Sequence, residues 1–107
     1  MPQDSRSAYR LTHEALDDID ALTYNIAEHS GWDRSMRVEA QLFAAFDEIA
    51  RTPGIGHLRL DLIPADIYVH LSDPYLILHR RDTQPVVILA VLHGSRDVAA
   101  IMQKRAN

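Results

Sequence analysis

The residue types best suited to chemistry lie toward the end of the chain. His93 and Arg96 stand close together, and Arg80 and Arg81 precede them in the sequence. An imidazole ionises near neutral pH, so His93 could act as a general acid or base. Arginine holds phosphate oxygens through forked donors. These residue types would suit RNA cleavage, in which a 2′-hydroxyl proton is removed, the leaving oxygen is protonated and cations stabilise the phosphorane.

A structural role for the same residues is an equally good interpretation. A histidine that ends a buried strand is often a hydrogen-bonded group at the sheet edge. Arg96 and Asp97 can order the start of a helix. Arg80 and Arg81 alternate across a strand, so at most one of them faces a given site. The sequence alone leaves both interpretations open.

Metal and cofactor chemistry is not expected. The chain has no cysteine, which excludes thiolate chemistry and Cys-based zinc sites. The six histidines are scattered at positions 13, 29, 57, 70, 79 and 93, without an HxH or HxxxH pair. We therefore expect no metal site and no cofactor.

The length and the apolar pattern predict one soluble domain. A chain of 107 residues is sufficient for a single core. We expect a flexible N-terminus over residues 1–7 and one domain over residues 8–105. The first residues lack the apolar region of a signal peptide, and the longest apolar run, Val86–Leu92, is too short to span a membrane. A cytoplasmic protein without membrane association is the resulting expectation.

The charge is unevenly distributed along the chain. The formal net charge is −4, but residues 1–50 carry ten acids and four arginines, whereas residues 51–107 carry five acids and seven bases. An anion would therefore bind to the second half. The acidity of the whole chain argues against broad affinity for nucleic acids, and no sequence-specific DNA binding by this chain is expected.

Two amphipathic helices are expected after a short first strand. Residues Ala8–Leu11 alternate as a strand does, and Thr12 can cap the helix that follows. Apolar residues recur at helical spacing up to Ser30 and Gly31, namely Leu16, Ile19, Leu22 and Ile26. A second stripe, capped at Asp33 or Ser35 and ending before Pro53, comprises Val38, Leu42, Ala45, Phe46 and Ile49. The tight turn between the helices predicts an antiparallel hairpin.

The second half of the chain predicts a sheet. Residues 53–66 read as irregular, and three strands follow at Ile67–Leu71, Tyr75–Arg81 and Val86–His93. The turns between them are short, so neighbouring strands should be antiparallel. Val86–Leu92 is apolar on both faces, which indicates a central, doubly covered strand. With a last helix at Val98–Arg105, capped at Ser95 or Asp97, the prediction is an α+β fold of order β-α-α-β-β-β-α. A helical hairpin would then pack on a small, mostly antiparallel sheet.

Four local patterns in this order resemble the ParE toxins of the ParE/RelE superfamily. They run from the beginning of the chain to the start of the last helix, and together they cover about residues 8–105. They are Tyr9-Arg10-Leu11-Thr12 with Ala15 and Asp18-Ile19; Phe46-Asp47-Glu48-Ile49-Ala50 with Pro53 and Gly56; Tyr75-Leu76-Ile77-Leu78-His79-Arg80; and Val91-Leu92-His93-Gly94-Ser95-Arg96-Asp97.

The resemblance implies the toxin of a type II toxin–antitoxin system. ParE-like members poison DNA gyrase and stall replication, whereas RelE-like members cut messenger RNA on the ribosome. Two departures weaken the RelE-like alternative. Residues 94–107 contain no aromatic residue, with Met102 where one would be expected, and Lys104 is the one lysine of the chain. A ParE-like gyrase inhibitor is therefore the preferred interpretation, without enzymatic activity. A third possibility is a degenerate member that only binds a partner.

The resemblance also suggests two sets of contact residues. A ParD-like antitoxin is expected to wrap its C-terminal segment over the toxin, and the acidic helix faces favour basic residues in that segment. The expected antitoxin-binding residues are Leu16, Asp20, Leu42, Phe43 and Phe46. The expected toxicity and target-binding residues are His93, Arg96, Asp97, Ile101 and Met102, with His93, Arg96, Arg80 and Arg81 as catalytic residues if the chain is a nuclease.

Overall fold

The structure, a computed structural model, describes residues 9–52, 54–80 and 82–107. The predicted flexible N-terminus lies outside these residues. Eight elements follow one another along the chain: β1 (Tyr9–Leu11), α1 (His13–Ser30), α2 (Trp32–Arg51), β2 (His57–Arg59), β3 (Ile67–Ser72), β4 (Tyr75–Arg80), β5 (Val86–His93) and α3 (Val98–Ala106). The predicted α+β class is confirmed.

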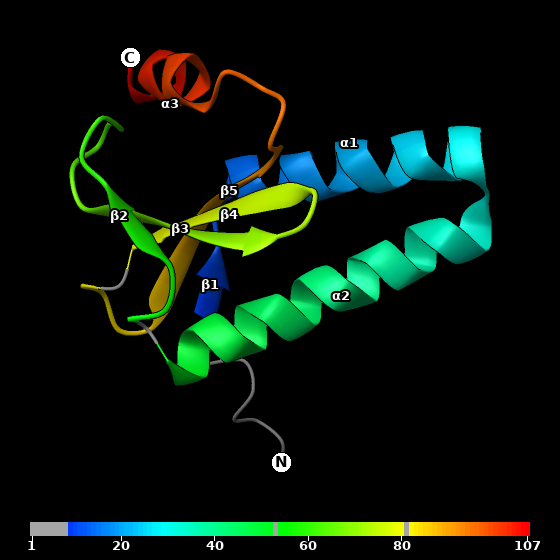
Figure 1. Cartoon of the computed structure of the whole chain (residues 1–107), viewed down its shortest axis with the longest axis horizontal. Coiled ribbons are helices and arrows are strands. Elements are labelled where there is room, and N and C mark those ends of the chain that lie inside the picture. The colour runs from blue at the N-terminus through cyan, green and yellow to red at the C-terminus, as the bar shows by residue number, and fades with distance from the viewer. Residues whose placement is uncertain (1–8, 53, 81) are drawn as a thin grey trace.

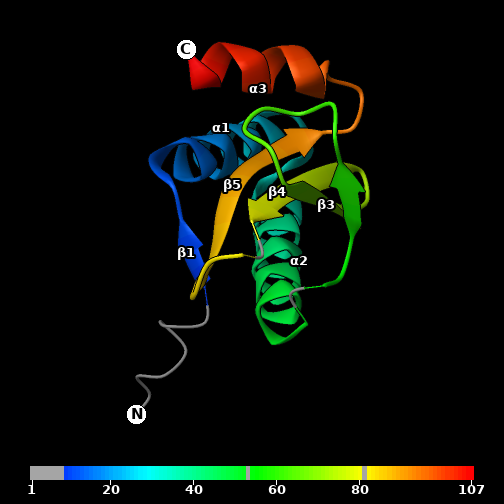
Figure 2. The same ribbon diagram turned by 90° about the vertical axis from the view of Figure 1, so that its left-hand side faces the viewer.

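The five strands form one sheet in the order β1-β5-β4-β3-β2. β1 pairs in parallel with the first half of β5, and every other pair is antiparallel. The α1–α2 hairpin packs on one face, and α3 lies across the other (Figure 1 and Figure 2). β5 is covered on both faces, as predicted. It is not the middle strand, however, because β1 adds to its outer side and β4 takes the centre.

The short strand β2 was missed by the sequence pattern. Its three residues are mostly exposed, so no apolar alternation marks it. Its position depends on Gly56, whose φ of 97° is accessible to glycine. A Cβ at this position would lie 2.6 Å from the carbonyl oxygen of Val69 in β3. The backbone approaches β3 closely here, and β2 pairs with it directly afterwards.

The helical hairpin begins and turns at short-range signals. Thr12 caps α1 as predicted, since its Oγ1 accepts a hydrogen bond from the Ala15 amide at 3.1 Å. The prediction of a cap at Asp33 or Ser35 was wrong, because α2 already begins at Trp32 with Gly31 as its cap residue. Gly31 has a φ of 95°, which allows the sharp turn between the helices.

Ser35 instead fastens the two helices together. It is 5% exposed, and its hydroxyl donates to the Thr23 carbonyl oxygen of α1 at 2.7 Å. We expect Ser35→Ala to lower the free energy of unfolding by about 1 kcal/mol, because one buried hydrogen bond is lost. Urea unfolding followed by circular dichroism measures this change. Ser30→Ala, exposed at the end of α1, is the control, and equal stability of Ser35→Ala and wild type would contradict the assigned role.

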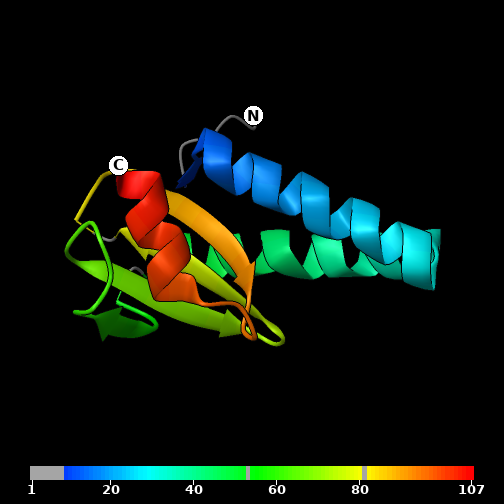
Figure 3. The ribbon, with the colours of Figure 1, turned by 90° about the horizontal axis from the view of Figure 1, so that it is seen from above.

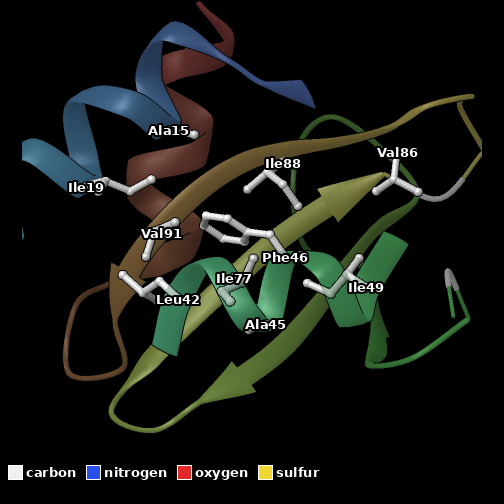
Figure 4. Close-up of a cluster of buried hydrophobic side chains, with 10 residues drawn as sticks. All are labelled: Ala15, Ile19, Leu42, Ala45, Phe46, Ile49, Ile77, Val86, Ile88 and Val91. Carbon is white, nitrogen blue, oxygen red and sulfur yellow. The ribbon is translucent and has the colours of Figure 1, made fainter. Parts of the chain in front are cut away.

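The main core lies between the hairpin and the sheet. Phe46 is at its centre and points from α2 toward β5 (Figure 4). The ten buried residues of this cluster are Ala15, Ile19, Leu42, Ala45, Phe46, Ile49, Ile77, Val86, Ile88 and Val91. A second cluster on the opposite face anchors α3 through Val98 and Met102. The two clusters hold the hairpin, the sheet and α3 as one layered unit.

Candidate functional site

A groove with a volume of about 600 Å³ lies where α1 passes the end of β5. We call it the His93 groove. Its polar and aromatic lining comes from α1, β4, the end of β5 and the segment after it, and these side chains are Asp18, Tyr24, Asn25, Tyr75, His93 and Arg96. His93 and Arg96 therefore lie in one groove, as the sequence suggested. Tyr24 and Tyr75 were not anticipated, because only the packing of α1 beside β5 brings them there.

A β-bulge in β5 aims His93 into this groove. Leu78 pairs with Ala90 and His79 with Ile88, so Leu89 is an extra residue in β5. The bulge reverses the alternation of side chains along the strand. Ile88 and Val91 consequently face the hairpin core, while Ala90 faces α3. His93, two residues after Val91, shares its direction and reaches the side of the sheet where α1 runs.

The imidazole of His93 is held in one tautomer. The Ser95 amide donates to His93 Nδ1 at 3.1 Å, and the Ser95 hydroxyl lies 2.8 Å from the same nitrogen. Because an amide can only donate, Nδ1 carries the lone pair and the neutral ring carries its proton on Nε2. The ring also meets Tyr75 edge-on at 5.6 Å between centroids. In this arrangement the lone pair of the neutral ring is engaged with Ser95, and its N–H is left to donate to another group.

The groove is cationic at one end. Arg96 is exposed, and within the described part of the chain it forms no salt bridge. The carboxylate in the lining, Asp18, is already neutralised, since it accepts two hydrogen bonds from Arg105 at 3.0 and 2.7 Å. These bonds raise the pKa of the Arg105 guanidinium above its ordinary value. Asp18 also accepts a hydrogen bond from the Val91 amide at 3.0 Å. This bond satisfies an amide on the edge of β5 at a point that β1 does not reach.

The remaining residues of the nuclease hypothesis do not converge on His93. Tyr75 pairs with His93 and Arg80 with Val87, so Arg80 lies at the opposite end of β4, about 16 Å away at the usual rise of a strand. Arg80 is also engaged, donating to Asp82 at 3.2 and 3.0 Å, and this contact lowers the pKa of the Asp82 carboxyl. Arg81 lies outside the described residues.

The other predicted target-binding residues take mostly structural positions. Asp97 caps α3 by accepting from the Ala100 amide at 3.1 Å. Met102 is 4% exposed and belongs to the core beneath α3, which is a structural position rather than a surface one. Ile101 is half-buried against the same cluster. Together with His93 and Arg96, Asp97 remains accessible at the surface.

Some of the predicted antitoxin-binding residues are buried, and others lie on the surface. Leu42 and Phe46 are 1% and 0% exposed, so they belong to the core of this structure rather than to its surface. Phe43 is half-buried and packs edge-on against Phe46 at 5.2 Å. Leu16 and Asp20 are exposed. Besides Leu16, the large exposed apolar side chains of the hairpin are Tyr24, Trp32 and Met36, which the sequence pattern did not single out.

The comparisons with known proteins agree with this fold. A sequence model described as "ParE toxin of type II toxin-antitoxin system, parDE" matches residues 9–98. The chain belongs to the ParE toxin family. Among solved structures, a chain from the chromosomal ParDE toxin–antitoxin system of P. aeruginosa superposes with a TM-score of 0.68 at 16% identity, covering 79% of this chain and 92% of that one. A comparison with curated proteins gives no match.

Two further features of this ParE-family chain bear on its chemistry. Within the described residues, no group of three or more histidine, aspartate or glutamate side chains is arranged to hold a metal ion. The helices of that part of the chain are also too short or too polar to cross a membrane.

Proposed function

We propose that this ParE-family toxin inhibits DNA gyrase in the cytoplasm, blocks replication and arrests growth, and that a cognate ParD-like antitoxin neutralises it. Membership of the ParE family supports the toxin role. The ParDE system to which the similar solved chain belongs supports a ParD-like partner. The choice between binding and catalysis depends on the His93 groove.

The hydrogen bonds of His93 favour binding over RNA cleavage. Nδ1 is occupied by Ser95, and the other nitrogen carries the proton of the neutral ring. A general base needs a free lone pair within reach of the hydroxyl proton that it removes. Arg80 is too distant to supply a second group. This groove is better suited to holding a partner through the His93 N–H and Arg96 than to moving protons.

A cleavage assay with purified proteins tests the gyrase proposal. The toxin, gyrase and supercoiled DNA should yield linear DNA trapped on the enzyme, and Arg96→Ala should reduce this yield by about tenfold because a charged contact is lost. Arg10→Ala, exposed on β1 at the far end of the sheet, is the matched control and should act as wild type.

Cells in which the toxin is induced alone provide the opposing outcome. DNA synthesis should stop before protein synthesis. Cut messenger RNA, with protein synthesis stopping first, would instead show a RelE-like nuclease. Growth without any arrest would show a member that has lost toxicity.

A further inference from the structure

A second surface adjoins the His93 groove on the helical hairpin. Tyr24 and Trp32 are each 69% exposed and Met36 is 49% exposed. They line a hollow of about 180 Å³ between α1 and α2, with Asp20 and Glu39 at its rim. We call these five residues the hairpin patch. Large apolar side chains gathered on the surface of a soluble protein mark a contact site for another molecule.

The hairpin patch and the His93 groove meet at Tyr24 on α1. Tyr24 lines both the hollow and the groove. The hairpin extends well beyond the sheet (Figure 1 and Figure 3), and a segment that crosses α1 at Tyr24 would reach from one region to the other. One partner segment can therefore contact both regions across Tyr24.

The two ends of this surface carry opposite charge. Asp20 and Glu39 are the charged residues lining the hollow, and neither forms a salt bridge within the described part of the chain. At the other end, Arg96 and His93 line the groove, and the carboxylate of Asp18 is already paired with Arg105. A partner of uniform charge would be attracted at one end and repelled at the other.

We propose that a single antitoxin segment crosses this surface with a matching charge pattern. Apolar side chains pack on Tyr24, Trp32 and Met36. A lysine or arginine lies against Asp20 and Glu39, and an aspartate or glutamate lies against Arg96. This inference rests on the proposed function and refines it, because the basic residues expected from the acidic helix faces suit the hairpin end alone. It also explains neutralisation, since the segment fills the groove proposed to hold the target.

Charge reversal at each end tests the pattern. Binding of the cognate antitoxin is measured by titration calorimetry for wild type, for the double variant Asp20→Lys/Glu39→Lys and for Arg96→Glu. Each reversal should weaken binding by about tenfold or more, because an attractive contact becomes repulsive. The matched controls Asp47→Lys, on the other half of α2, and Arg10→Glu, on β1, are exposed charges outside the surface and should bind as wild type.

Compensating changes in the antitoxin identify the contacts. Changing an antitoxin lysine or arginine to glutamate should restore binding to the Asp20→Lys/Glu39→Lys toxin. Changing an antitoxin aspartate or glutamate to lysine should restore binding to Arg96→Glu. Circular dichroism confirms that each variant is folded. The neutral double variant Asp20→Asn/Glu39→Gln should lose less antitoxin affinity than the charge reversal Asp20→Lys/Glu39→Lys.

Two results would overturn the inference in distinguishable ways. If wild type binds the antitoxin but the reversals at both ends bind as tightly as the controls, the segment does not follow this surface, while the partner itself stands. If the two reversals weaken binding but the same basic antitoxin residues contact both ends, the mixed charge pattern is wrong. A toxin that binds no antitoxin at all would overturn the proposed function as well.

Discussion

Phe46→Ala is expected to lower the free energy of unfolding by about 3–5 kcal/mol, a large part of the stability of a domain of this size. Phe46 is fully buried at the centre of the core between the hairpin and the sheet. Its ring meets Tyr9 of β1 at 5.5 Å and Phe43 of α2 at 5.2 Å between centroids. Truncation removes these contacts and leaves a cavity that the surrounding helix and strands can fill only in part.

The size of this effect separates a core role from a surface role. Phe46→Leu keeps most of the volume and should cost less than about 2 kcal/mol. Phe43→Ala removes a half-buried ring of the same chemistry, so it should fall clearly below Phe46→Ala. Urea unfolding at several protein concentrations gives the three values. If Phe46→Ala kept wild-type stability but lost antitoxin binding, the side chain would lie on the surface after all.

The elements of this fold that depend on local signals were predictable from the sequence. The side chain of Thr12 itself provides the cap of α1, and the continuous apolar run Val86–Leu92 spans nearly the whole of β5. Both boundaries were predicted correctly for this reason. β2 has three mostly exposed residues, and its pairing depends on the close approach of Gly56 to Val69 across the sheet. Such a contact between distant residues leaves no periodic pattern to recognise.

The candidate site, too, was predictable from the sequence only in part. His93 and Arg96 were found because they are neighbours in sequence. The direction of His93 depends on the bulge at Leu89, and the bulge is visible only in the register between β4 and β5. Tyr24 and Tyr75 reach the groove from α1 and β4 through tertiary packing. The residue types indicated the chemistry of the site, whereas the other residues that line the groove could be identified only from the fold.

The burial of two predicted antitoxin-binding residues has a different cause. An apolar stripe at helical spacing identifies the face of a helix that is buried, but it does not say what buries it. In α2 the sheet covers this face, so Leu42 and Phe46 became core. The exposed apolar residues Trp32 and Met36 lie off the stripe near the turn of the hairpin, where the sheet no longer covers the helices.

Asp18→Ala is the second substitution with a large expected effect, a loss of about 2–4 kcal/mol in the free energy of unfolding. The Asp18 side chain is 10% exposed and joins three elements. It accepts from the Val91 amide of β5 and from both terminal nitrogens of Arg105 in α3. Without it, a partly buried guanidinium and a strand amide both lose their partner.

The separate contributions can be resolved by further variants. Asp18→Asn keeps an oxygen that can accept from Val91 but removes the charge that pairs with Arg105, so it should cost less than Asp18→Ala. Arg105→Met leaves the hydrogen bond from Val91 intact. A double-mutant cycle of Asp18→Ala with Arg105→Met therefore isolates the ion pair.

An exposed pair in the same chain provides the comparison. Arg59 donates to Asp61 at 2.8 and 2.7 Å, which is similar geometry, but their side chains are 37% and 56% exposed. Asp61→Ala should leave stability unchanged within the precision of urea unfolding, because water screens and replaces this contact. Equal effects at Asp61 and Asp18 would show that burial does not set the strength of the Asp18 contact.

Hydrogen exchange then tests whether Asp18 protects the free edge of β5. β1 pairs with β5 only as far as Ile88, so the Val91 amide depends on the Asp18 carboxylate for its hydrogen bond. Its exchange should accelerate in Asp18→Ala far more than in Arg105→Met, while the Ile77 amide, inside β4, should change only with global stability. Unchanged protection of Val91 in Asp18→Ala would mean that the carboxylate holds α3 alone. Faster exchange would show that one side chain of α1 both closes the sheet edge beside the His93 groove and holds α3 over the sheet.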